Sequence, residues 1–275
     1  MIYIIEGETL LFTLQKLLQP ETIEEAYKIL TEKKANTVLG GCCFLRMGSK
    51  RIGTGIELSK LNLDYIKEDS DYIEIGAMTN FRDIETSDIL NKYFNGVLSK
   101  SVSNIIGVQF RNVVTVGATV FSKYGFSDFI TGLLSLDTEV ELFGAGRMSL
   151  EEFLNMPYKK DLLTRIFIKK DSRKATFKDF RNSVSDYSIL NVSVSNKEDN
   201  WRIVVGARPV MAAIAKNASE ELSKGEITTE KIELVANIAA EELGFGTNMR
   251  ATKEYRKALC KVLVKRAIME VLECK

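Results

Sequence analysis

The pattern of the chain changes at one charged run, residues 169–174 (KKDSRK). Before this run, short helical and strand-like patterns alternate. After it, strand patterns at 175–180, 189–195 and 201–205, with a polar turn at 196–200, predict a three-stranded antiparallel meander. Helical patterns then follow at 229–243 and 252–272. Strands followed by helices predict an α+β fold. We therefore expect two domains, residues 1–170 and 171–275.

The last helical pattern is long enough to indicate its own buried face. Tyr255, Ala258, Leu259, Val262 and Leu263 share one side at helical spacing, whereas lysines occupy the other side. We expect the apolar side to pack on the predicted sheet.

The 275-residue chain contains no histidine, which restricts its chemistry. Ser-His-Asp and Cys-His catalysis, histidine-ligated metals and a histidyl-linked cofactor are all excluded. The 38 basic and 37 acidic residues nearly cancel, which argues against a nucleic-acid binder that depends on bulk charge. If the chain is an enzyme, we expect a cofactor to supply its chemistry.

Cysteine usage and the N-terminal segment bear on location. Cys42, Cys43, Cys260 and Cys274 form no C-x-x-C pair, so zinc-ribbon and iron–sulfur spacings are absent from the sequence. So few cysteines in 275 residues favour a reducing compartment, and we expect the cytoplasm. The segment 1–18 has no basic start and no long apolar run, which predicts neither a signal peptide nor a membrane span.

A glycine pair follows the predicted strand at 37–39. Gly40 and Gly41 could let consecutive amide groups point into one concavity that suits a pyrophosphate. The alternative is an ordinary tight turn.

Two further segments carry polar groups in suggestive patterns. The first, 109–119, runs on through Ser122 to Asp128, and a carboxylate among hydroxyls suits a polyol such as a ribityl chain; the alternative is a hairpin with a solvated Asp. In the second, Lys178 and Asp186 could face a shared cleft, and the alternative is an edge strand with paired surface charges.

Taken together and in order, these segments resemble the FAD-binding flavoproteins of the molybdenum hydroxylases, of the xanthine dehydrogenase and carbon monoxide dehydrogenase types. The resemblance covers about residues 17–273. It rests on PETIEEA at 20–26, LGG at 39–41, IGAMT at 75–79, QFRN at 109–112, TVGA at 115–118, SD at 127–128 and NMRATKEYR at 248–256. The family pattern usually has Thr-Asp where this chain has Cys42 and Cys43, and Gly-Asn where it has Ala118 and Thr119.

The resemblance implies a PCMH-type FAD-binding domain of two α+β subdomains, at about residues 1–57 and 58–170, followed by a C-terminal domain with a three-stranded antiparallel sheet and helices. It implies FAD as cofactor, which passes electrons to NAD or another acceptor. A partner small subunit would hold [2Fe–2S] centres, and a partner large subunit would bind the molybdopterin and the substrate. It implies a set of cofactor-binding residues and no side-chain catalyst: Leu39, Gly40, Gly41, Cys42, Cys43 and Phe44 at the pyrophosphate; Thr115, Gly117, Ala118, Thr119 and Ser122 in a second loop; Asp128 at ribityl or ribose hydroxyls; and Leu163 and Lys178 near the isoalloxazine.

Two other hypotheses remain. The substitutions in both loops suggest a degenerate family member that assembles with its partners but binds FAD weakly or not at all. We rank a stand-alone flavin oxidase third. Such enzymes often use a histidine-linked flavin, and this chain contains no histidine.

Overall fold

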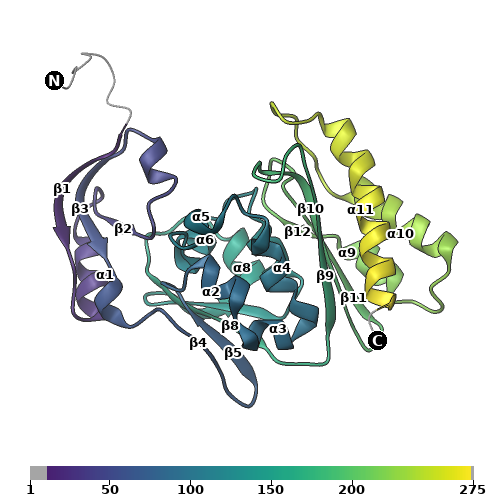
Figure 1. Cartoon of the computed structure of the whole chain (residues 1–275), viewed down its shortest axis with the longest axis horizontal. Coiled ribbons are helices and arrows are strands. Elements are labelled where there is room, and N and C mark those ends of the chain that lie inside the picture. The colour runs from purple at the N-terminus through teal and green to yellow at the C-terminus, as the bar shows by residue number, and fades with distance from the viewer. Residues whose placement is uncertain (1–10, 274–275) are drawn as a thin grey trace.

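The computed structural model describes residues 11–273 of the chain. Residues 1–10, part of the segment considered for a signal peptide, and Cys274 lie outside this range. Figure 1 shows three parts side by side along the long axis: a small N-terminal sheet, a middle sheet covered by helices, and a C-terminal sheet with the two longest helices. Within residues 11–273 no helix has the length and apolar character needed to span a membrane.

The N-terminal part is a parallel sheet with one helix. Strands β1 (Thr13–Leu18), β3 (Arg51–Glu57) and β2 (Thr37–Leu39) lie in the order β1-β3-β2. Helix α1 (Ile23–Glu32) starts as its sequence predicts, because the Thr22 hydroxyl accepts the Glu25 amide at 3.1 Å. Its buried residues Ala26 and Leu30 pack against Ile56.

The middle part is a five-stranded sheet in the order β4-β5-β8-β6-β7. Its strands are β4 (Ile66–Glu68), β5 (Tyr72–Gly76), β6 (Thr138–Leu142), β7 (Gly146–Ser149) and β8 (Leu163–Lys169). The helices are short: α2 (Phe81–Thr86), α3 (Asp88–Lys92), α4 (Val97–Ser103), α5 (Val108–Arg111), α6 (Val116–Phe121), α7 (Asp128–Leu134) and α8 (Leu150–Asn155). Aliphatic and aromatic residues of these helices and strands form the largest buried core.

The C-terminal part confirms the predicted meander and adds to it. Strands β9 (Lys174–Arg181), β10 (Ser188–Lys197) and β11 (Asn200–Gly206) are antiparallel, and a fourth short strand, β12 (Ala213–Ile214), pairs with β11. Helices α9 (Lys216–Leu222), α10 (Thr229–Glu242) and α11 (Lys253–Glu273) follow. The predicted α+β class is therefore confirmed.

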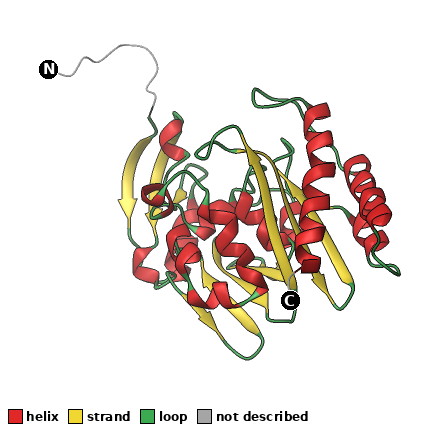
Figure 2. Ribbon diagram, turned by 45° about the vertical axis from the view of Figure 1, so that its right-hand side comes forward, coloured by secondary structure: helices red, strands yellow, loops and turns green. Residues whose placement is uncertain are grey.

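This sheet lies between two helical layers, as Figures 1 and 2 show. Helices α10 and α11 pack on one face with Leu190, Val192 and Val194. The other face meets the middle part, because Phe177 and Val204 belong to the core of that part. The C-terminal sheet is thus the wall between the two larger parts of the molecule.

The buried face of α11 is shifted by about one residue from the face that the sequence predicted. Tyr255, Ala258 and Val262 are exposed, and the buried positions are Arg256, Cys260, Leu263, Val264, Ala267, Ile268 and Val271. The prediction missed this because it excluded the charged Arg256, which the structure buries against main-chain carbonyls.

Candidate functional site

The loop that carries the glycine pair forms one wall of a groove of about 410 Å³. The opposite wall is helix α6, and the lining includes Leu39, Gly40, Cys42, Cys43, Phe44, Ala118, Thr119 and Ser122. This volume lies in the range of small-molecule and cofactor sites, about 300–1,000 Å³. The structure thus brings together the two loops that the sequence pattern singled out.

At both glycine positions, neighbouring atoms of the protein leave no room for a side chain. Gly41 has φ of +71°, and a Cβ there would lie 1.9 Å from the Val113 carbonyl oxygen. A Cβ on Gly40 would lie 2.7 Å from Cβ of Ala118. The first loop therefore rests directly against the second, which sets the width of the groove.

The first loop offers unused hydrogen-bond donors. Within residues 11–273, the amide groups of Gly41, Cys42, Cys43 and Phe44 donate to no protein acceptor. Gly41 and Cys42 are consecutive left-handed residues, with φ of +71° and +59°. Successive amides in a turn form concavities that bind anions. The loop therefore fits the pyrophosphate of FAD through its backbone, whichever side chains occupy positions 42 and 43.

The second loop forms a helix, so the alternative of a hairpin is wrong. The Thr115 hydroxyl accepts the Ala118 amide at 3.3 Å and begins α6. The Gly117 amide donates to the Ala77 carbonyl at 2.7 Å, and a Cβ on Gly117 would lie 2.8 Å from that oxygen. Thr115 and Gly117 thus fix α6 to the end of β5, while Ala118, Thr119 and Ser122 line the groove.

The QFRN motif also has a structural role. The Arg111 guanidinium donates to both carboxylate oxygens of Glu85, at 2.8 and 3.0 Å, and to the Ile105 carbonyl at 3.1 Å. It holds the segment leading to α6 against α2.

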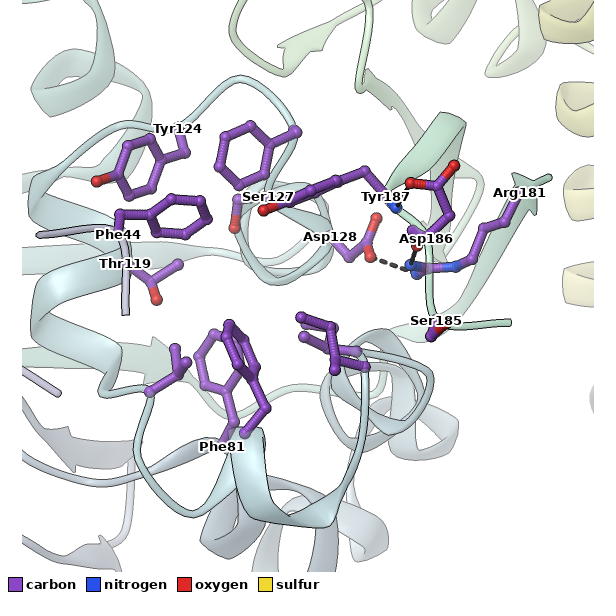
Figure 3. Close-up of a pocket in the computed structure, with 15 residues that line it drawn as sticks. Phe44, Phe81, Thr119, Tyr124, Ser127, Asp128, Arg181, Ser185, Asp186 and Tyr187 are labelled. Carbon is purple, nitrogen blue, oxygen red and sulfur yellow. Dashed lines mark hydrogen bonds and ion pairs between the residues drawn. The ribbon is translucent and has the colours of Figure 1, made fainter. Parts of the chain in front are cut away.

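Four aromatic rings close one end of the groove. Phe44 contacts Tyr124 and Phe126, with centroids 4.7 and 5.2 Å apart, and Phe126 meets Tyr187 of the C-terminal part at 4.8 Å. Figure 3 shows Phe44, Tyr124 and Tyr187 along one side of a second, smaller cavity of about 60 Å³. Phe44, Thr119 and Tyr124 line both spaces, so the groove continues toward the C-terminal part.

Asp128 lines this smaller cavity, but its carboxylate is bound to the C-terminal part. One oxygen pairs with Arg181 of β9, as Figure 3 shows. The other oxygen accepts hydrogen bonds from Ser188 Oγ at 2.7 Å and from Asn191 Nδ2 at 2.5 Å. Burial raises the pKa of Asp128, and Arg181 and the two hydrogen bonds oppose that shift. The alternative of a solvated Asp is wrong, because only 4% of the residue is exposed. The helix cap is Ser127, whose hydroxyl accepts the Ile130 amide at 3.2 Å.

Two other residues implied by the resemblance lie away from both cavities. Leu163 is buried in the core of the middle sheet. Lys178 pairs with Glu270 of α11, on the face of β9 that it shares with Thr176, which donates to the same carboxylate at 2.6 Å. Asp186 pairs instead with Arg250, at 3.0 Å. The expectation that Lys178 and Asp186 face one cleft is therefore wrong.

The sequence interpretation missed Arg181, Tyr124, Phe126 and Tyr187. Arg181 could have been found, because the period-two pattern of β9 places it opposite Lys178, on the face shared with Phe177 and Asp179. The three aromatics carry no local signal, since their ring contacts join segments far apart in the chain.

Comparison with known proteins finds two family matches along the chain. Residues 12–170 match the family described as the FAD binding domain in molybdopterin dehydrogenase, and residues 175–271 match the CO dehydrogenase flavoprotein C-terminal domain. The nicotine 6-hydroxylase medium subunit of Paenarthrobacter nicotinovorans is 24% identical over 269 residues, which cover 91% of this chain and 95% of that one. The glyceraldehyde dehydrogenase medium chain of Sulfolobus acidocaldarius is 24% identical over 271 residues, with coverage of 91% and 96%.

Solved structures share the fold. Reconstituted CO dehydrogenase from Oligotropha carboxidovorans superimposes with a TM-score of 0.86 and 18% identity, over 95% of this chain and 98% of that chain. Quinoline 2-oxidoreductase from Pseudomonas putida gives a TM-score of 0.85 and 17% identity, over 95% and 97%. The resemblance to the molybdenum hydroxylase flavoproteins is thus confirmed. Because the first family match spans more than half of its length, the chain belongs to the FAD-binding domain family of the molybdopterin dehydrogenases, with FAD as its cofactor.

Proposed function

We propose that this chain is the medium subunit of a molybdenum hydroxylase complex and passes electrons from a partner chain through FAD to NAD or another acceptor. The observation that carries the proposal is the groove lined by the two loops, where four amides of the first loop have no protein acceptor among residues 11–273. The absence of histidine agrees with this role, because no proton-transfer group of that type is needed to carry electrons.

The residues around the groove suggest how the cofactor is held. Residues 39–44 would bind the pyrophosphate mainly through backbone amides, with Ala118, Thr119 and Ser122 on the opposite wall. FAD supplies the redox chemistry when bound. The aromatic rings of Phe44, Tyr124, Phe126 and Tyr187 exclude water from the end of the groove. Asp128 would act at this end by holding the C-terminal part against the middle part. Leu163 and Lys178 lie away from both cavities and are not among the residues proposed to hold FAD.

The partners follow from the relatives, which carry the names medium subunit and medium chain. We propose a large subunit that binds molybdopterin and substrate, and a small subunit with [2Fe–2S] centres. A cytoplasmic location belongs to the same proposal, since Cys42, Cys43 and Cys260 are all free thiols.

A second candidate is an assembly subunit that binds FAD weakly. It is favoured by Cys42, which occupies a left-handed conformation in the very loop that would hold the pyrophosphate. A non-glycine residue in a left-handed conformation is uncommon. The loop also has two thiols where the family pattern usually has Thr-Asp.

An absorption spectrum of the purified chain separates the two candidates. A flavin spectrum with about one FAD per chain, and its bleaching by NADH under anaerobic conditions, would support electron transfer between FAD and NAD. A flavin that other reductants bleach but NADH does not would point to a different acceptor. A colourless chain that fails to take up FAD in a titration would favour the assembly subunit.

A further inference from the structure

A third cavity, of about 400 Å³, lies between the middle and C-terminal parts. Phe126 and Tyr187 line both this space and the smaller aromatic cavity, so the two rings form a shared wall. The remaining lining comes from Gly125, Ser188, Ala207, Pro209, Asn248, Arg250 and Arg256. We call it the arginine cavity.

Its two arginines are held in place by different partners. Arg250 pairs with Asp186 at 3.0 Å, and its guanidinium lies 4.8 Å from the centre of the Tyr187 ring. Arg256 is 1% exposed and donates to the carbonyls of Ile189, Gly246 and Ala251 and to the Asn248 side chain, at 2.7 to 2.9 Å.

Positive charge at this place is not balanced. Arg208 follows a residue that lines the cavity but does not line it itself, and it is 6% exposed. Its terminal nitrogens donate to the Gly244 and Met211 carbonyls, and its Nε has no hydrogen-bond partner within the described chain. Neither Arg208 nor Arg256 has a carboxylate within salt-bridge distance among residues 11–273. Arg256 also lies in the first turn of α11, where the helix dipole is positive. Burial, and for Arg256 the neighbouring Arg250, lower the pKa of both groups.

The carbonyl contacts of Arg256 hold the segments around it together, but they do not neutralise its positive charge. Carbonyl oxygens are neutral, whereas buried charges in proteins are usually paired. One acidic side chain, Asp186, lies beside the two guanidinium groups that line a space large enough for a ligand. An anion would complete this arrangement.

We propose that the arginine cavity binds the phosphate group of a small organic phosphate. Guanidinium groups recognise phosphate through paired hydrogen bonds, and phosphate carries the negative charge that Arg256, without a carboxylate partner among the described residues, requires. The volume exceeds the needs of a free phosphate ion, which favours a phosphate attached to a larger molecule. This site is separate from the groove proposed for FAD, and it does not depend on FAD binding.

The test uses the full chain, saturated with FAD, in phosphate-free buffer. Binding of inorganic phosphate, pyrophosphate and ADP is measured by calorimetry for the parent chain, Arg250→Gln and Arg250→Lys. The matched control is Arg82→Gln, because Arg82 is also a partly exposed arginine paired with a carboxylate, Glu85, at 2.8 Å. Arg250→Gln should weaken binding about tenfold or more, Arg250→Lys should restore part of it, and the control should leave it unchanged.

The outcomes are distinct. Tighter binding of ADP than of pyrophosphate and inorganic phosphate, weakened by Arg250→Gln, supports an organic phosphate. Inorganic phosphate that binds as tightly as ADP would contradict it, because the site would then recognise the phosphate group alone. Equal affinities for the parent and Arg250→Gln would overturn the proposal, because the anion would then bind elsewhere, and so would the absence of binding at millimolar concentrations. Flavin content is read separately from absorbance. A chain without flavin would contradict the proposed function and still leave the comparison between the parent and Arg250→Gln readable.

Discussion

At the scale of single residues, backbone conformation explains more of the first loop than side-chain chemistry does. Gly41 contacts Val113 so closely that no side chain fits, and its φ is positive as well. Replacing it with valine should push the first loop away from the second and open the groove. We expect Gly41→Val to lose most of its bound FAD while keeping a cooperative thermal transition.

Gly225 provides the control for this prediction. It also has a positive φ, +59°, but no atom lies within 4 Å of the position its Cβ would take. Gly225→Val therefore carries the conformational cost without the contact. Normal flavin content in Gly41→Val, or equal losses in the two variants, would contradict the role of the contact.

Cys42 gives a second prediction at this scale. The resemblance alone suggests that threonine at this position would improve FAD binding by the loop. However, β-branched residues strongly disfavour positive φ. At φ of +59°, we expect Cys42→Gly to be more stable than Cys42→Thr by about 1–2 kcal/mol. Equilibrium denaturation in urea measures the difference, and a threonine variant as stable as the glycine variant would count against the left-handed conformation.

At the scale of elements, periodicity predicted the long segments well and the short ones poorly. The meander, α10 and α11 follow directly from their patterns. Strands β1 and β12 and helix α9 were missed, because short segments depend on neighbours that a local pattern does not contain. The face of α11 was wrong for a related reason: the burial of Arg256 depends on carbonyls supplied by residues distant in sequence, such as Ile189.

The corrected face of α11 leads to a prediction about cysteine reactivity. Cys260 is fully buried, and burial raises its pKa to about 12. A raised pKa keeps the thiol protonated as the pH increases, and the thiolate is the reactive form. We expect iodoacetamide at pH 8 to leave Cys260 unmodified in the folded chain and to modify it in denaturant, with peptide mapping by mass spectrometry as the measurement.

Cys42 and Cys43 serve as the internal comparison, because both are only partly buried. Burial raises their pKa as well, so slow modification is expected, but at rates above that of Cys260. Modification of Cys260 at the same rate in the folded chain and in denaturant would contradict the buried face of α11.

At the scale of the whole molecule, the candidate site divides into a part that the sequence could predict and a part that it could not. The two loops were found because each is a contiguous motif with its own glycine. The closing end of the groove was not, because Phe44, Phe126 and Tyr187 meet only when the three parts of the chain pack together. Asp128 was found, but its partners Arg181 and Asn191 are 53 and 63 residues away in sequence.

Those partners make Asp128 the principal polar link between the middle and C-terminal parts around the groove. Asp128→Asn keeps the shape of the side chain and removes its charge, which leaves Arg181 buried with Asp179 as its remaining ion-pair partner. Breaking a buried pair in this way costs about 3 kcal/mol or more. Loss of the cap in Ser127→Ala, by contrast, should cost about 1 kcal/mol.

We therefore expect Asp128→Asn to lower the free energy of unfolding by clearly more than Ser127→Ala does, as measured by denaturation in urea. FAD binding should also weaken in Asp128→Asn, because the closed end of the groove depends on contact between the two parts, whereas Ser127→Ala should retain its FAD. The double variant Asp128→Leu, Arg181→Met removes both charges of the most deeply buried pair and should recover part of the lost stability. Recovery should be partial, because Asp179, whose side chain is 17% exposed, loses Arg181 as its partner. If Asp128→Asn is as stable as the parent but binds FAD poorly, the carboxylate acts on the cofactor directly, and its role as an interdomain link is wrong.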